Sequence, residues 1–113
     1  MNELKREFLD FNSLAGSKEN TFCVNLNENK EHRNKKFEIF CYLVDLGYIV
    51  FSEVISKDRK NRYDLVAFDI NGNGYIIEII NTETQESIEN KKLKYPYPQF
   101  DLIFVKTNEE FKI

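Results

Sequence analysis

The stretch that decides the fold reads Tyr63-Asp-Leu-Val-Ala-Phe-Asp-Ile70, Asn71-Gly-Asn-Gly74 and Tyr75-Ile-Ile-Glu-Ile-Ile-Asn-Thr82. Two runs rich in β-branched and aromatic residues, separated by an Asn- and Gly-rich tetrapeptide, are typical of a β-hairpin. Each predicted strand carries one carboxylate inside its apolar run, Asp64 in the first and Glu78 in the second. A buried carboxylate is costly unless it is paired, hydrogen-bonded or bound to a cation. These two acids are therefore the first candidates for a functional site.

A tight hairpin would bring Asp64 and Glu78 to neighbouring positions on one sheet face, provided that the register matches. Two carboxylates side by side repel one another, and a divalent cation relieves the repulsion. The purely structural alternative for Asp64 is a strand-end acid that pairs with Arg62 or caps a turn. For Glu78 the alternative is a strand position that faces solvent.

The bulk properties are those of a soluble globular protein. The chain has 113 residues, of which 42% are hydrophobic and 31% charged, so we expect a single domain over residues 1–113 with one hydrophobic core. It shows neither an apolar run of membrane-spanning length nor a signal-peptide core. The sequence thus predicts a cytoplasmic protein with no membrane partner. The formal net charge of -3 argues against a dominant basic surface.

The elements on either side of the hairpin complete the predicted core, which spans about residues 29–106. Helical spacing of apolar residues predicts a helix over 29–46, which Gly47 would end as a C-terminal cap. Further elements are strands over 48–55 and 101–106 and a helix over 83–94. In the N-terminal extension, residues 1–28, we expect a helix over 2–14 and a short edge strand over 21–26.

This order of elements predicts the sheet topology. Three consecutive strands form an antiparallel meander, and a strand-helix-strand crossover makes the last pair parallel. The expected fold class is α/β (α+β), with a central mixed four-stranded sheet flanked by helices and an N-terminal helical extension.

The predicted order of elements is αβββαβ, with one acid in the second strand, one in the third and Glu38 in the first helix. This combination of element order and acids resembles the PD-(D/E)xK superfamily, the restriction-endonuclease-like and Holliday-junction-resolvase-like nucleases. The resemblance covers about residues 29–106. It implies that Asp64 is the motif aspartate, that Glu78 is its second acid and that Glu38 is a supporting helical glutamate.

The last position of the motif departs from the family. The motif places a lysine two residues after the second acid, where it shares the sheet face and can activate the attacking water. This chain has Ile80 there, which cannot do that chemistry. Five polar residues are candidate substitutes from neighbouring elements, namely Lys35, Lys36, Lys91, Lys92 and Gln85.

The resemblance also implies a cofactor and a partner. Asp64, Glu78 and the carbonyl of Ile79 would hold Mg²⁺ or Mn²⁺ for hydrolysis of a DNA phosphodiester. Basic side chains near these acids would bind the phosphates of the DNA backbone with little sequence selectivity. The candidates are Lys57, Arg59, Lys60, Arg62, Arg33, His32 and Lys35.

Three hypotheses about function remain open at this level. The first is a metal-dependent endonuclease, either with or without selectivity for a particular DNA structure. The second is a nucleic-acid-binding or assembly protein that keeps the fold without catalysis, for which Ile80 is the direct evidence. The third is a protein-interaction domain in which the aromatic stretch 95–100 and the N-terminal helix support a homodimer.

Overall fold

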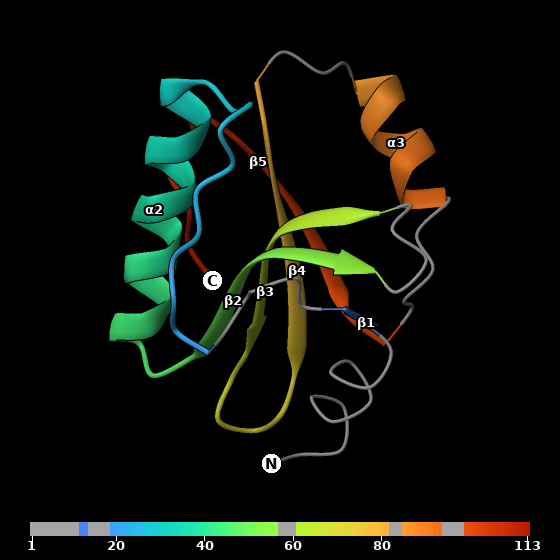
Figure 1. Ribbon diagram of the computed structural model, residues 1–113. Coiled ribbons are helices and arrows are strands. Elements are labelled where there is room, and N and C mark those ends of the chain that lie inside the picture. Colours follow the sequence, from blue (N-terminus) through green and yellow to red (C-terminus); the bar gives the residue numbers. More distant parts are fainter. Residues whose placement is uncertain (1–11, 14–18, 57–60, 82–84, 94–98) are drawn as a thin grey trace.

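The computed structural model describes residues 12–13, 19–56, 61–81, 85–93 and 99–113, which form one sheet and two helices. The elements are β1 Asn12–Ser13, α2 Lys30–Asp45, β2 Ile49–Ser56, β3 Arg62–Phe68, β4 Gly74–Ile80, α3 Gln85–Leu93 and β5 Asp101–Lys106. The strands lie in the order β1-β2-β3-β4-β5, and only the last pair, β4 and β5, is parallel. Figure 1 shows α2 and α3 on opposite sides of these strands. The expected α+β class with a mixed sheet is confirmed.

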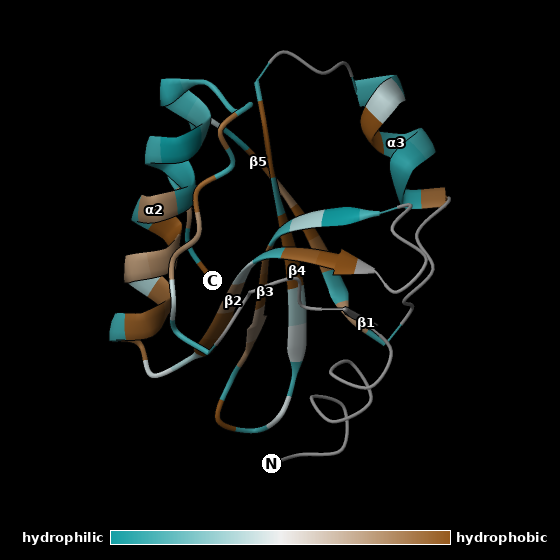
Figure 2. Cartoon of the chain, in the orientation of Figure 1, coloured by the Kyte–Doolittle hydropathy of each residue, from teal (hydrophilic) through white to brown (hydrophobic). Residues whose placement is uncertain are grey.

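Two clusters of buried side chains occupy the two faces of the sheet. The first packs α2 onto the sheet and consists of Ile39, Phe40, Leu43, Val50, Leu65, Ala67, Ile77, Ile79, Val105 and Phe111. The second consists of Phe51, Val54, Tyr63, Val66, Phe68, Ile76 and Phe100. Neighbours such as Leu65 and Val66 fall into different clusters because successive strand side chains point to opposite faces. The hydrophobic colour of the central strands in Figure 2 reflects this burial on both faces.

The ends of α2 follow from local sequence. Asn29 is the N-cap, and its side-chain oxygen accepts the backbone N–H of His32 at 2.8 Å. Beyond the C-terminal end, Gly47 has a φ of +91° and donates its N–H to the carbonyl of Val44. The helix predicted over 29–46 is therefore confirmed within one residue at each end.

Two predictions for the N-terminal extension need correction. Most of the helix expected over residues 2–14 lies outside the described residues, but Asn12 and Ser13 form β1 beside β2, so that helix does not reach residue 14. The edge strand expected over 21–26 is reduced to a single bridge between Thr21 and Phe51. Ser52 Oγ accepts the N–H of Cys23 at 2.7 Å, so a side chain takes the place of a strand hydrogen bond.

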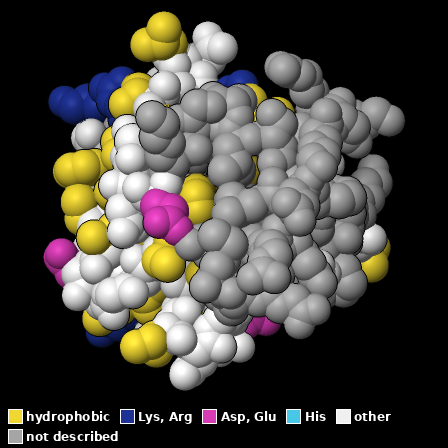
Figure 3. All heavy atoms as spheres, turned by 60° about the horizontal axis from the view of Figure 1, so that its bottom comes forward, with side chains coloured by type: hydrophobic (Ala, Val, Ile, Leu, Met, Phe, Trp, Pro, Cys, Tyr) yellow, Lys and Arg dark blue, Asp and Glu magenta, His cyan; other side chains and the backbone are white. Residues whose placement is uncertain are grey.

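Several large apolar side chains are exposed among the described residues. They are Val24, Leu26, Phe37, Leu46, Ile70, Leu93 and Ile113. In the space-filling view, hydrophobic side chains interrupt the polar surface along one side of the face shown (Figure 3). The aromatic stretch expected to support a dimer lies mostly outside the described residues, and Phe100 is buried in the core. Within the described part of the chain, neither helix is long and apolar enough to span a membrane.

The cap at Gly47 gives a test of the local structure. No atom lies within 4 Å of the Cβ that an alanine would add, so steric contact is not a factor. The positive φ is unfavourable for any L-residue with a side chain. Gly47→Ala should therefore lower the free energy of unfolding by about 1 kcal/mol, measured by urea denaturation. A gain in stability would contradict the left-handed conformation.

Candidate functional site

The site lies where β3 and β4 separate. Their ladder of paired residues ends at Leu65 and Ile77, and the same register would make Asp64 and Glu78 the next pair. Beyond that point β3 stays paired with β2, and β4 stays paired with β5. We call the space between the two diverging strands the fork. The hairpin register therefore brings the two acids together at the mouth of the fork, as the sequence predicts.

The two acids share hydrogen bonds inside the fork. Their carboxyl groups hydrogen-bond to one another, and the carboxyl of Glu78 also accepts the backbone N–H of Asp64. Asp64 Oδ2 in turn accepts the N–H of Ile79 at 2.8 Å. The N–H and C=O of one strand residue point to the same edge, so the carbonyl of Ile79 is directed into the fork as well.

The side chains of the two acids do not follow one face of the sheet, contrary to the expectation from the sequence. Glu78 lies between Ile77 and Ile79, which both pack in the first cluster, so it leaves β4 on the face opposite α2. Asp64 instead contacts α2, although its neighbour Leu65 also packs on that side. The regular alternation of side chains is therefore broken at Asp64, and the two carboxyl groups meet between the faces.

A second irregularity lies opposite this break, on β2. Glu53 sits opposite Asp64 in the register and has a φ of +52°, which is uncommon for a residue other than glycine. Val54, one residue later, packs in the second cluster, while the Glu53 carboxylate reaches α2 on the other side. Such backbone strain persists only where surrounding contacts hold it. At this pair of positions, both strands direct their carboxylates towards α2.

Burial and mutual repulsion separate the protonation states of the two acids. Burial and the neighbouring charge of Asp64 raise the pKa of Glu78 well above its usual value, and the positive charge of Lys91 offsets this in part. Burial also opposes ionisation of Asp64, but hydrogen bonds from His32 and the Ile79 N–H outweigh it and lower the Asp64 pKa. The pair therefore favours an ionised Asp64 beside a protonated Glu78.

His32 connects the acid pair to the start of α2. Its Nε2 lies 3.3 Å from Asp64 Oδ2, and its Nδ1 lies 2.7 Å from Glu28 Oε2. The hydrogen bond to Asp64 is the largest cause that raises the His32 pKa, and the bond to Glu28 acts in the same direction. A single imidazole thus bridges two carboxylates, one before α2 and one on β3.

Lys36 is fully buried and anchors the other side of this network. Its Nζ lies 2.9 Å and 3.1 Å from the two oxygens of Glu28 and 2.6 Å from Glu53 Oε1. The ring of Phe22 lies 5.2 Å away and adds a cation-π contact. Glu53 Oε2 makes no hydrogen bond, and Arg62 Nε lies 3.9 Å from it. Lys36 thereby fixes the two carboxylates that flank the acid pair.

The structure separates the predicted site residues into groups. Asp64, Glu78, Ile79 and His32 meet at the fork, and Lys36 is connected to His32 through Glu28. Lys91 is exposed on α3, and its charge acts on Glu78. Lys57, Arg59 and Lys60 lie outside the described residues. Arg62 is half-exposed beside Glu53, and Arg33 is half-buried on α2.

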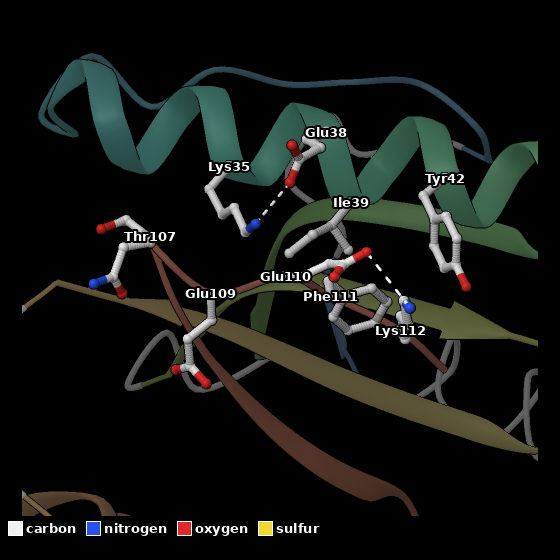
Figure 4. A pocket seen from close by; sticks show the side chains of 10 residues that line it. Lys35, Glu38, Ile39, Tyr42, Thr107, Glu109, Glu110, Phe111 and Lys112 are labelled. Carbon is white, nitrogen blue, oxygen red and sulfur yellow. Dashed lines mark hydrogen bonds and ion pairs between the residues drawn. The ribbon is translucent and has the colours of Figure 1, made fainter.

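Glu38 and Lys35 are not brought to the fork. They pair with one another at 2.7 Å on a different flank of α2, because residue 38 lies about 200° around the helix from residue 36. Both line a pocket of about 480 Å³ between α2 and the segment after β5 (Figure 4). The expected supporting role of Glu38 is therefore not reflected in the geometry, and the pocket and the acid pair mark different places.

Sequence reasoning missed Glu28 and Glu53. Glu28, His32 and Lys36 recur every four residues, a spacing that places side chains on one helix face, so this signal was present in the sequence. Glu53 had no such signal, since strand alternation would point it away from α2.

Among the described residues, no three His, Cys, Asp or Glu side chains already form a set of metal ligands. Comparison with protein-family models, with curated proteins and with solved structures finds no match for this chain. The chemistry of the site therefore has to be argued from its own residues.

The buried network around Lys36 can be tested by stability. Lys36→Met removes the cation that two buried carboxylates share and should lower the free energy of unfolding by about 3–5 kcal/mol. Lys35→Met, one residue away, removes only the partner of an exposed carboxylate and should cost less than about 1 kcal/mol. Chemical denaturation of both variants measures the difference, and equal losses would contradict the role of Lys36.

The raised pKa of Glu78 predicts a pH-dependent gain in stability for Glu78→Gln in EDTA. Below the unfolded-state pKa the glutamate is protonated in both states, so the variant should match the wild type. As pH rises from the unfolded-state pKa to the raised folded-state pKa, the unfolded wild type releases a proton that the folded wild type keeps, so the wild type loses stability and the glutamine variant does not. Thermal melts from pH 4 to pH 8 should show the gain growing with pH. Glu38→Gln, at an exposed position, is the control.

Proposed function

We propose that this protein is a metal-dependent nuclease with a restriction-endonuclease-like core, acting on DNA phosphodiester bonds. The observation that carries the proposal is the contact between Asp64 and Glu78 inside the fork. Two carboxyl groups from adjacent strands meet there with little access to water, and burial together with the charge of Asp64 raises the pKa of Glu78 well above its usual value. A glutamate with a raised pKa reduces the stability of the fold at pH values above its unfolded-state pKa, and strongly shifted pKa values of this kind cluster at functional sites.

The residues at the fork fit a hard divalent cation. The groups available are the carboxylates of Asp64 and Glu78 and the carbonyl of Ile79, which are oxygen donors of the kind that Mg²⁺ and Mn²⁺ prefer. Binding of such a cation would replace the proton on Glu78 and remove the repulsion between the acids. When bound there, it would supply Lewis-acid stabilisation of a phosphoryl oxygen and a bound water of lowered pKa.

The chain's own residues would hold this site in shape. The N–H of Ile79 fixes one oxygen of Asp64, and the ladder between β3 and β4 fixes the separation of the two acids. With Ile80 at the motif lysine position, another lysine has to orient the attacking water. Lys91 is the better placed candidate, because its charge already acts on Glu78 from α3. Lys36 is fully buried, and its Nζ is occupied by Glu28 and Glu53.

Positive charge near the fork supports a nucleic-acid substrate. Arg62 is half-exposed at the start of β3, and Lys91 and Lys92 are exposed at the end of α3. Cations on two sides of an acidic site can hold a phosphate backbone while the acids face the scissile bond. Because the net charge of the protein is -3, attraction of DNA would depend on these local cations rather than on the overall charge.

A second candidate function is DNA binding without cleavage. It is favoured by Ile80 at the lysine position and by the full engagement of Lys36, which leaves that lysine no hydrogen bond for a reacting water. In this case the protein should bind DNA with an affinity that falls steeply as salt rises. Neutralising Arg62 should weaken that binding.

Cleavage of branched, single-stranded and supercoiled DNA in Mg²⁺ or Mn²⁺ tests the first proposal. The wild type should cleave at least one of these, and EDTA should abolish cleavage. Asp64→Asn and Glu78→Gln should each reduce the rate by more than the roughly 10- to 100-fold typical of an outer-sphere partner, because each removes a carboxylate ligand. Gel assays under single-turnover conditions provide the measurement.

Glu38→Gln is the matched control, since Glu38 lies on another flank of α2. This variant should cleave DNA at the rate of the wild type. Equal cleavage by wild type and Glu78→Gln would indicate a contaminating nuclease. Salt-dependent DNA binding with no cleavage under any of these conditions would favour the second candidate.

A further inference from the structure

The hydrogen bonds around Asp64 are distributed unequally between its two oxygens. Oδ2 lies 2.8 Å from the N–H of Ile79 on β4 and 3.3 Å from Nε2 of His32 on α2. Both of these contacts are made to Oδ2. Two elements that approach from different directions therefore hold Oδ2, and they leave Oδ1 on the side of Glu78 and of a ligand in the fork.

His32 is itself fixed at three points. Its backbone N–H donates to the N-cap side chain of Asn29, which sets the first turn of α2. Its Nδ1 contacts Glu28 Oε2 at 2.7 Å, which sets the plane of the ring. Its Nε2 then has only one direction left, towards Asp64.

The Glu28 carboxylate is held firmly enough to fix the position of the His32 ring. Its side chain is 5% exposed. The N–H of Asn25 donates to Oε1 at 3.1 Å, and Lys36 Nζ contacts both oxygens. Successive contacts therefore connect Lys36 to Glu28, Glu28 to His32, and His32 to Asp64. They lead from the buried Lys36 to the fork.

We propose that His32 is a positioning residue of the acid site, which orients Asp64 by its Oδ2 so that Oδ1 is presented to a cation between Asp64 and Glu78. This proposal rests on the function proposed above. Outer-sphere partners of this kind orient the groups that bind a metal directly, and their loss typically lowers metal affinity about 10- to 100-fold. In this role His32 does not touch the cation.

Titration calorimetry with Mn²⁺ on the full chain tests the proposal. His32→Ala should weaken Mn²⁺ binding about 10- to 100-fold. His32→Gln should recover most of the affinity, because its side-chain amide can place an N–H donor near the position of Nε2. Asn34→Ala, at an exposed position on the same helix, should bind like the wild type. Thermal melts of each variant check that the fold is intact.

A second readout separates positioning from general damage to the site. In the DNA cleavage assay, His32→Ala should need a higher Mn²⁺ concentration for half-maximal rate, while the rate at saturating Mn²⁺ should stay within about a factor of ten of the wild type, less than the loss expected for a ligand. If His32→Ala is too unstable to assay, His32→Gln alone still tests the role, since it should bind Mn²⁺ nearly as well as the wild type.

Two outcomes would overturn the proposal. Unchanged Mn²⁺ affinity in His32→Ala would mean that Asp64 needs no orientation from α2. An equal and complete loss of Mn²⁺ binding in both His32 variants would make the imidazole a direct ligand. Failure of the proposed function gives a different result, because the wild type itself would then neither bind Mn²⁺ nor cleave DNA.

Discussion

The contact between the carboxyl groups of Asp64 and Glu78 is the constraint around which the rest of the site is arranged. Two acids can lie this close in a largely buried place only if one keeps its proton or a cation takes the place of that proton. The raised pKa of Glu78, which favours its protonated form, and the hydrogen-bond donors around Asp64 are consistent with this requirement. A divalent cation would meet it as well, which links the stability of the fold to its proposed chemistry.

Around this pair the protein places alternating charges rather than a purely apolar core. Lys36 lies between Glu28 and Glu53, and His32 lies between Glu28 and Asp64. Lys36 and His32 each contact two carboxylates, so the three carboxylates of Glu28, Glu53 and Asp64 share their partners. The arrangement spans the start of α2 and two adjacent strands. It therefore connects the packing of the helix on the sheet to the position of Asp64.

The strained backbone at Glu53 is a local irregularity that lies beside the site. In a regular sheet, residues 53 and 64 would point away from α2, and their carboxylates would meet the second apolar cluster. Glu53 instead has a positive φ, and the two carboxylates contact Lys36 and His32 on the helix. The cost of that strain is of order 1–3 kcal/mol, which is smaller than the cost of leaving two carboxylates unpaired in an apolar cluster.

The sequence by itself determined the hairpin, the boundaries of α2 and the parallel last strand, because apolar periodicity, Asn29 and Gly47 act locally. It also determined that Asp64 and Glu78 would be neighbours, since hairpin register follows from a short turn. Only the tertiary structure decided that Glu28, His32, Lys36 and Glu53 surround them and that Glu38 does not. Those contacts depend on the rotation of α2 over the sheet and on the backbone of Glu53. Both result from packing between distant segments, so the four-residue spacing of Glu28, His32 and Lys36 groups these side chains without showing what they contact.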